Sequence, residues 1–84
     1  MSRNWKDGET TSHYLYYNDY GRIIGEVLRA GHQVNTKHVA TIYPSTTDIV
    51  NLGMYINTDY AKSAVERWWK DHDNIIHNNL IESD

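Results

Sequence analysis

The chain contains no cysteine and no phenylalanine, and its 84 residues include a single proline. Without cysteine, neither a disulfide scaffold nor a thiolate metal site can form. No apolar run approaches the ~20 residues that span a bilayer, and the residues after Met1 do not form the apolar segment of a secretory signal. We therefore expect a cytoplasmic protein in a reducing compartment, with no membrane partner.

Positive charge is also scarce, with eight Lys and Arg against eleven Asp and Glu and a net charge of −3. Residues 1–56 carry five charges of each sign, and residues 57–84 carry three basic residues against six acidic ones. Proteins that bind nucleic acid through its phosphates normally present a clustered basic surface. The charge balance therefore favours a protein partner.

Aromatic residues are plentiful in spite of the missing Phe, with three Trp and seven Tyr. A chain of this length is one domain near the lower size limit for independent folding. Each aromatic ring buries roughly 150–250 Å², so the rings must supply much of the core. The choice of Tyr and Trp over Phe indicates that many rings keep a polar edge near water or a partner.

Extended chain is expected through the first two thirds of the sequence. Residues 1–12 are polar apart from Trp5, and we interpret them as a flexible arm. Four segments rich in β-branched and aromatic residues follow, separated by turn residues, and each is typical of a strand: 13–17, 22–29, 37–43 and 49–56. Gly25 lies inside the second segment and indicates a bulge or a close backbone approach.

A helical period begins after Asn57, which with Asp59 supplies helix-capping chemistry. The spacing places Ala61, Ala64, Trp68 and Ile75 at the centre of an apolar stripe, and Trp69 about 90° away at the border with solvent. Residues 71–74 are poor helix formers, so we expect a kink or the end of the helix there. The predicted fold is α+β: a three- to four-stranded antiparallel sheet packed against one C-terminal helix, in a single domain of residues 13–80 with an acidic tail at 81–84.

Two short motifs resemble the Apetala/ethylene-response-factor type of DNA-binding domain. They are Leu52-Gly53-Met54-Tyr55 and Ala61-Lys62-Ser63-Ala64. Gly25, Ala40 and Ile42 add to the resemblance, which covers roughly residues 22–70 and extends to small modules in phage integrase arms and short phage proteins. It implies a three-stranded sheet with one helix, in which Gly53 lets its strand pass close under the helix.

The same family reads DNA with Arg and Trp on its exposed sheet face. The corresponding region here offers Glu26, Leu28, Arg29, His38, Thr41 and Tyr43, of which Arg29 alone keeps an unconditional positive charge. The sequence thus departs from the family where the function would lie.

The favoured hypothesis is a small non-enzymatic protein-binding module, an accessory or inhibitor of the kind that phages encode, acting in the host cytoplasm. Its expected contacts are aromatic side chains on an open sheet face and at its edge: Tyr14, Tyr16, Tyr43 and Trp69. The alternative is a nucleic-acid-binding module that uses Arg22, Arg29, Lys37 and His38 on the same face. Open sheet edges could also pair two copies into a homodimer.

Catalysis and metal binding have weaker sequence support. Ser, Thr, His and Asp are all present, but none lies in a recognisable nucleophile turn, so a small enzyme is the third hypothesis. Asp73 and His77 are four residues apart with His72 nearby, yet no two histidines share the short helical spacing that a metal site would use. We expect no metal and no cofactor.

Overall fold

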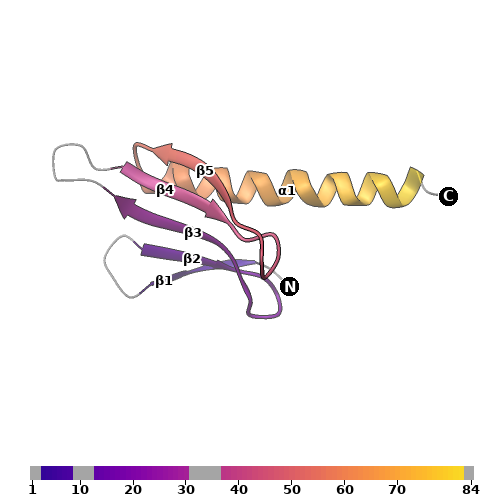
Figure 1. Ribbon diagram of the computed structural model, residues 1–84, viewed down its shortest axis with the longest axis horizontal. Helices are drawn as coiled ribbons and strands as arrows, with labels where there is room; N and C mark the ends of the chain where they lie inside the picture. The colour runs from indigo at the N-terminus through magenta and orange to yellow at the C-terminus, as the bar shows by residue number, and fades with distance from the viewer. Residues whose placement is uncertain (1–2, 9–12, 31–36, 83–84) are drawn as a thin grey trace.

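The computed structural model describes residues 3–8, 13–30 and 37–82, and for 76–82 it describes the backbone alone. Five strands form one antiparallel sheet in chain order, and a helix follows them (Figure 1): β1 (Asn4–Asp7), β2 (His13–Tyr17), β3 (Ile23–Ala30), β4 (Lys37–Ile42), β5 (Val50–Tyr55) and α1 (Thr58–Glu82). The predicted α+β class, with an antiparallel sheet and one C-terminal helix, is confirmed. The sheet has five strands instead of three to four.

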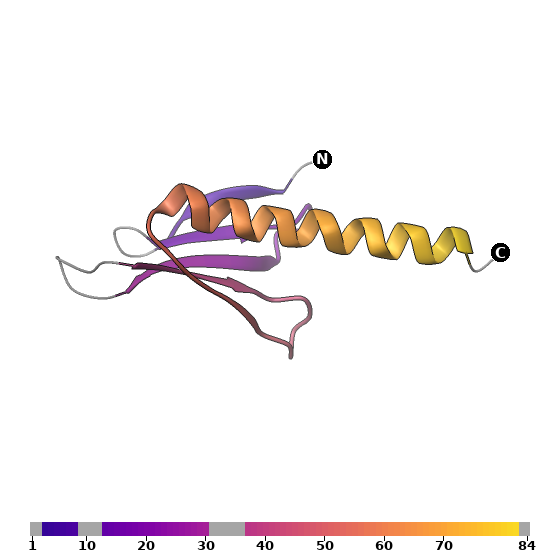
Figure 2. The same cartoon turned by 90° about the horizontal axis from the view of Figure 1, so that it is seen from above.

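Helix α1 covers one face of the sheet and leaves the other face uncovered (Figure 2). The helix begins with the predicted cap, because the Asn57 Oδ1 accepts a hydrogen bond of 2.8 Å from the Tyr60 N–H. The expected break at residues 71–74 was wrong: the helix runs on to Glu82 and includes the first half of the predicted acidic tail. Poor helix formers cost at most about 0.7 kcal/mol each, too little to end a helix that packing has already nucleated.

The centre of the buried stripe on α1 is formed by Ala61, Val65 and Trp69, which are spaced four residues apart. Trp69 is only 7% exposed, and its indole N–H donates a 2.9 Å hydrogen bond to the Ile24 carbonyl in β3. The prediction had Trp68 at the centre and Trp69 at the solvent border, and this order was wrong. Ile75 is 58% exposed, so including it in the stripe displaced the predicted centre.

Within the described residues, no helix combines the length and apolar character needed to cross a bilayer.

Gly25 makes the close backbone approach that the sequence indicated, whereas Gly53 does not have the helix-packing role expected of it. A methyl group added at Gly25 would lie 2.6 Å from the Val65 Cγ1, so Gly25 is where the sheet passes close beneath α1. Gly53 has free space around its missing side chain and a φ of +111°, a conformation that other residues rarely adopt. It lies beside the register shift between β4 and β5, so its role is in the backbone and not in helix packing.

Strand β1 falls inside the predicted flexible arm, and for these residues the prediction was wrong. Arg3 forms two hydrogen bonds to the Asp73 carboxylate, at 2.7 and 3.1 Å, and these bonds are the main reason why the pKa of Arg3 is raised. The Trp5 indole N–H donates to Glu66 at 3.2 Å, and the Trp5 ring packs on Tyr16. The strand is therefore held by α1 as well as by β2. Residues 1–2 and 9–12 of the predicted arm lie outside the described residues.

Candidate functional site

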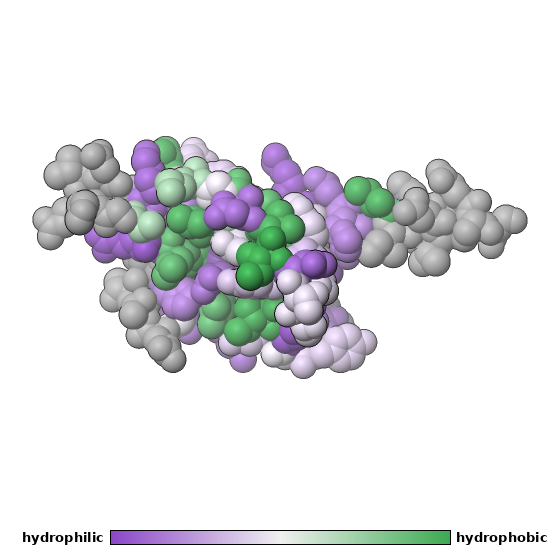
Figure 3. Space-filling model, viewed as in Figure 1, coloured by the Kyte–Doolittle hydropathy of each residue, from purple (hydrophilic) through white to green (hydrophobic). Residues whose placement is uncertain are grey.

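The face of the sheet that α1 leaves uncovered carries a row of apolar side chains. Directly paired residues in an antiparallel sheet project from the same face. The pairing register places four outward side chains next to one another, one on each of the strands β2 to β5: His13, Leu28, Val39 and Met54. The last three form what we call the apolar row, in which Leu28 is 43% and Met54 66% exposed. Figure 3 views this open face and shows apolar groups over its middle, interrupted by polar ones.

The neighbouring row is polar at its centre and is organised by Glu26. It consists of Lys6, Leu15, Glu26, Thr41 and Asn51. One oxygen of the Glu26 carboxylate is 2.6 Å from the His13 Nε2, and the other accepts a 2.7 Å bond from the Tyr43 hydroxyl. Burial, followed by this hydrogen bond, raises the pKa of Tyr43 to about 12, so that its phenol stays neutral and donates. Glu26 thus links β2, β3 and the end of β4 through one carboxylate.

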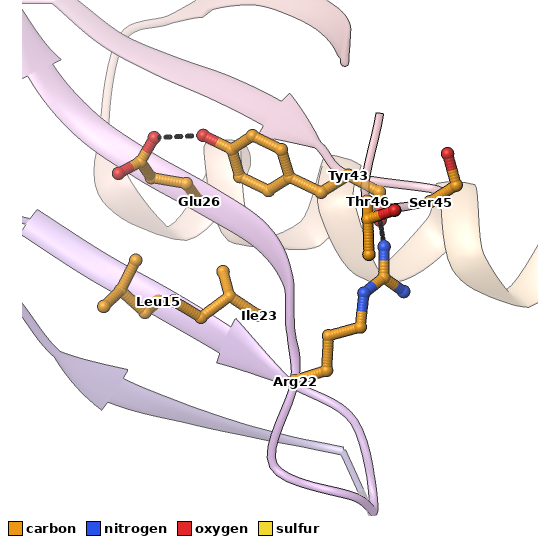
Figure 4. Close-up of a pocket in the computed structure, with 7 residues that line it drawn as sticks. All are labelled: Leu15, Arg22, Ile23, Glu26, Tyr43, Ser45 and Thr46. Carbon is orange, nitrogen blue, oxygen red and sulfur yellow. Dashed lines mark hydrogen bonds between the residues drawn. The ribbon is translucent and has the colours of Figure 1, made fainter. Parts of the chain in front are cut away.

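A shallow cavity of about 290 Å³ lies next to Glu26, where β2 and β3 meet the loop after β4. Figure 4 shows the seven residues that line it: Leu15, Arg22, Ile23, Glu26, Tyr43, Ser45 and Thr46. Leu15 and Ile23 form its aliphatic side. The Arg22 guanidinium lies opposite them and donates a 3.0 Å bond to the Tyr43 carbonyl. We call this hollow the Arg22 cavity.

The predicted protein-binding aromatics do not share the open face. Tyr16 is 8% exposed and belongs to the core, as Trp69 does, so neither ring is available as a surface anchor. Tyr14 pairs with the buried Val27 and packs against the core, with the Lys62 ammonium 3.9 Å from the centre of its ring. Tyr43 alone among the four lies on the open face.

The four residues predicted to contact nucleic acid are divided between the two faces. Arg29 pairs directly with His38, and each lies two residues from a buried residue that faces α1 (Val27 and Ala40), so both project from the face that α1 covers. The Nδ1 of His38 is buried without a hydrogen-bond partner among the described atoms. Lys37 precedes His38 and so projects from the opposite face, while Arg22 lies at the other end of β3. The structure therefore does not bring these side chains together.

The residues considered for a metal site have other contacts. Asp73 pairs with Arg3, and the ring of His72 stacks on Trp68 with 4.9 Å between ring centres. The side chain of His77 lies outside the described residues.

A second hollow, of about 450 Å³, lies on the helix side between α1 and β5. Its lining includes Tyr55 and Trp68 together with the charged Arg67 and Asp71. Strand β5, beside this hollow, is an edge strand of the sheet. Its Gly53 N–H donates a 2.7 Å hydrogen bond to the Asn51 Oδ1 of the same strand. The predicted pairing of sheet edges into a homodimer stays a prediction.

Several residues of the open face were missed as site residues from the sequence. They include the apolar row, His13, and Glu26 in its role as a shared acceptor. Alternation within each strand groups Leu28 with Glu26 and separates both from Val27. Only the register shows that Leu28, Val39 and Met54 are neighbours, and that His13 and Tyr43 both reach Glu26.

Models of known protein families, curated proteins and solved structures were compared with the chain, and none of them matches it.

Proposed function

We propose that the protein is a non-enzymatic protein-binding module whose contact surface is the open face of the sheet. One observation carries the proposal: outward positions on β3, β4 and β5 hold the apolar row. A solvated antiparallel face normally alternates to polar side chains at such positions. Apolar side chains gathered on a monomer's surface are typical of sites where another protein binds.

The Glu26 network makes this face suitable for burial. An unpaired carboxylate covered by a partner would lose its hydration without compensation, at a cost of several kcal/mol. Both oxygens of Glu26 already have partners within the chain, the His13 ring and the Tyr43 hydroxyl. A partner can therefore cover the centre of the face without supplying a group for this carboxylate.

A nucleic-acid-binding role has less support, because the four predicted basic contacts are divided between two faces. The chain's net charge of −3 also gives no general attraction for phosphates. The accessory or inhibitor role of a phage-encoded protein, and its place in the cytoplasm, stay predictions.

The test compares two double variants with similarly exposed targets. Leu28→Ser with Met54→Ser alters the apolar row, and Tyr60→Ser with Ile75→Ser alters apolar side chains of α1 that are both 58% exposed. Tagged proteins capture partners from a lysate of the source cells or of their host, and captured proteins are quantified against the unaltered chain. We expect roughly a tenfold loss for the first variant, since interface anchors contribute a kcal/mol or more each, and no loss for the second.

Both variants must keep the circular dichroism spectrum and the thermal unfolding transition of the unaltered protein. Equal capture by the two variants, or a selective loss in the α1 variant, would exclude the open face as the contact surface.

A further inference from the structure

Arg22 is held in place at both its backbone and its side chain. Its N–H donates to the Asn18 Oδ1 at 2.9 Å, and its carbonyl accepts from the Asn18 N–H at 2.9 Å. Its guanidinium donates to the Tyr43 carbonyl at 3.0 Å and lies at the Arg22 cavity (Figure 4). The group is half-buried and positioned before any ligand arrives, so binding there would not have to order a free side chain.

The charge of the guanidinium is not balanced by a carboxylate in the part of the chain that the structure describes. Among the residues that the structure describes, no carboxylate pairs with Arg22. The carboxylate of the same cavity, Glu26, has both oxygens engaged by His13 and Tyr43. Arginine carries five N–H donors, and the Tyr43 carbonyl takes one, so donors remain for an incoming acceptor.

The cavity has an apolar side as well as a cationic one. Leu15 and Ile23 form an aliphatic wall across from the guanidinium, and Ile23 is 38% exposed. The volume of about 290 Å³ is at the lower limit of small-molecule sites, which measure roughly 300–1,000 Å³. A space of this size suits one side chain better than a nucleotide-sized cofactor.

We propose that the Arg22 cavity is a socket for an acidic side chain of the bound protein. The carboxylate of a partner Glu or Asp pairs with the guanidinium, and its methylene groups lie against Leu15 and Ile23. Arginine and carboxylate match in geometry and form paired, charge-assisted hydrogen bonds. This inference rests on the proposed function, because it names the chemistry of the partner at one point of the same face.

The experiment is an NMR titration of the labelled full-length chain with N-acetyl-glutamate N-methylamide as the probe. The Arg22 side-chain N–H and the backbone N–H groups of Tyr43 and Thr46 report binding. We expect saturable shifts with half-saturation on the order of 10 mM, as a single partly exposed charged pair would give. The glutamine analogue of the probe, which has the same shape without the charge, should give no saturable shift.

Three variants make the result specific to the socket. Arg22→Gln should abolish the response, Arg22→Lys should weaken it because the paired geometry is lost, and Arg67→Gln on the exposed surface of α1 should leave it unchanged. An equal response to the glutamine analogue, a response that survives Arg22→Gln, or no saturation for the unaltered chain would overturn the proposal. So would a free dicarboxylate such as glutarate binding about a hundredfold more tightly than the probe, since that result identifies a metabolite site.

Failure here is separable from failure of the proposed function. If the probe does not bind while Leu28→Ser with Met54→Ser still lowers capture about tenfold, the socket is wrong and the open face remains the proposed contact surface.

Discussion

Glu26 lies at the centre of the open face and joins side chains from separate parts of the sheet. Its effect is clearest at Tyr43, whose pKa rises from 10.0 to about 12 because the phenol is partly buried and donates to this carboxylate. The folded state therefore holds the proton at pH values where the unfolded chain releases it. The stability that this contact contributes is complete below about pH 10 and is lost as the pH rises through about 12.

Tyr43→Phe tests this assignment through phenolate absorbance. At about pH 11, between the two pKa values, folded Tyr43 should still be neutral. The unaltered chain and the variant should then show the same phenolate signal although they differ by one tyrosine. A signal larger by one phenolate in the unaltered chain would show that Tyr43 titrates normally and that the bond to Glu26 does not persist.

His38 illustrates the opposite case, a polar atom without a partner. Its buried Nδ1 has no hydrogen bond among the described residues, and such an atom costs about 1–3 kcal/mol when no water reaches it. We expect His38→Leu to raise the free energy of unfolding by roughly 1 kcal/mol, measured by urea denaturation. A loss of stability would show that the ring nitrogen is satisfied in solution.

From the sequence, alternation within a strand shows which residues share one face of the sheet, but not what that face contacts. Tyr14 and Tyr16 were correctly grouped on one strand face, but nothing in the sequence indicates which face α1 covers. They lie on the covered side, so the open face belongs to Leu15, Glu26 and their neighbours. Tyr43 was recognised as a surface aromatic, whereas its bond to Glu26 depends on a register that spacing alone does not give.

Among the elements, β3 and α1 approach each other closely at Gly25. Gly25→Ala would place a methyl group 2.6 Å from the Val65 Cγ1. Val65 is buried and β-branched, so its side chain cannot rotate away easily, and α1 must shift. We expect a loss of about 1–3 kcal/mol in the free energy of unfolding.

A second substitution separates this steric effect from the intrinsic cost of alanine. Val65→Ala removes the group that the new methyl would meet. The double variant should therefore be less destabilised than the sum of the two single variants, by roughly 1 kcal/mol or more in a double-mutant cycle. Additive effects would contradict the close approach of β3 and α1.

The elements themselves were predictable where a clear period was present. The changes in spacing gave four strands and the start of α1 to within a residue or two. β1 was missed because Asn4–Asp7 is short and polar, and its stability comes from distant partners, including the Arg3–Asp73 pair and the Trp5–Glu66 bond. The centre of the α1 stripe was misplaced because the pattern could not show that Ile75 stays exposed.

At the scale of the whole molecule, the fold has two layers, and one face of its sheet remains open. Trp69, Val65 and Tyr16 fill the space between the layers, so much of the aromatic content stabilises the domain and is not available to a partner. The aromatic composition therefore did not show that Tyr16 and Trp69, two of the predicted contact residues, lie in the core. The surface that we propose for a partner is the apolar row, with the bonded Glu26 beside it and the Arg22 cavity at one end.

The most direct measurement is site-specific photo-crosslinking in the source or host cell, with p-benzoyl-phenylalanine placed at one position at a time. Val39 lies in the middle of the apolar row, and Tyr60 is an exposed position on α1. We predict a discrete protein adduct from position 39 that is absent from position 60. An adduct from position 60 with none from position 39 would contradict the open face as the binding surface.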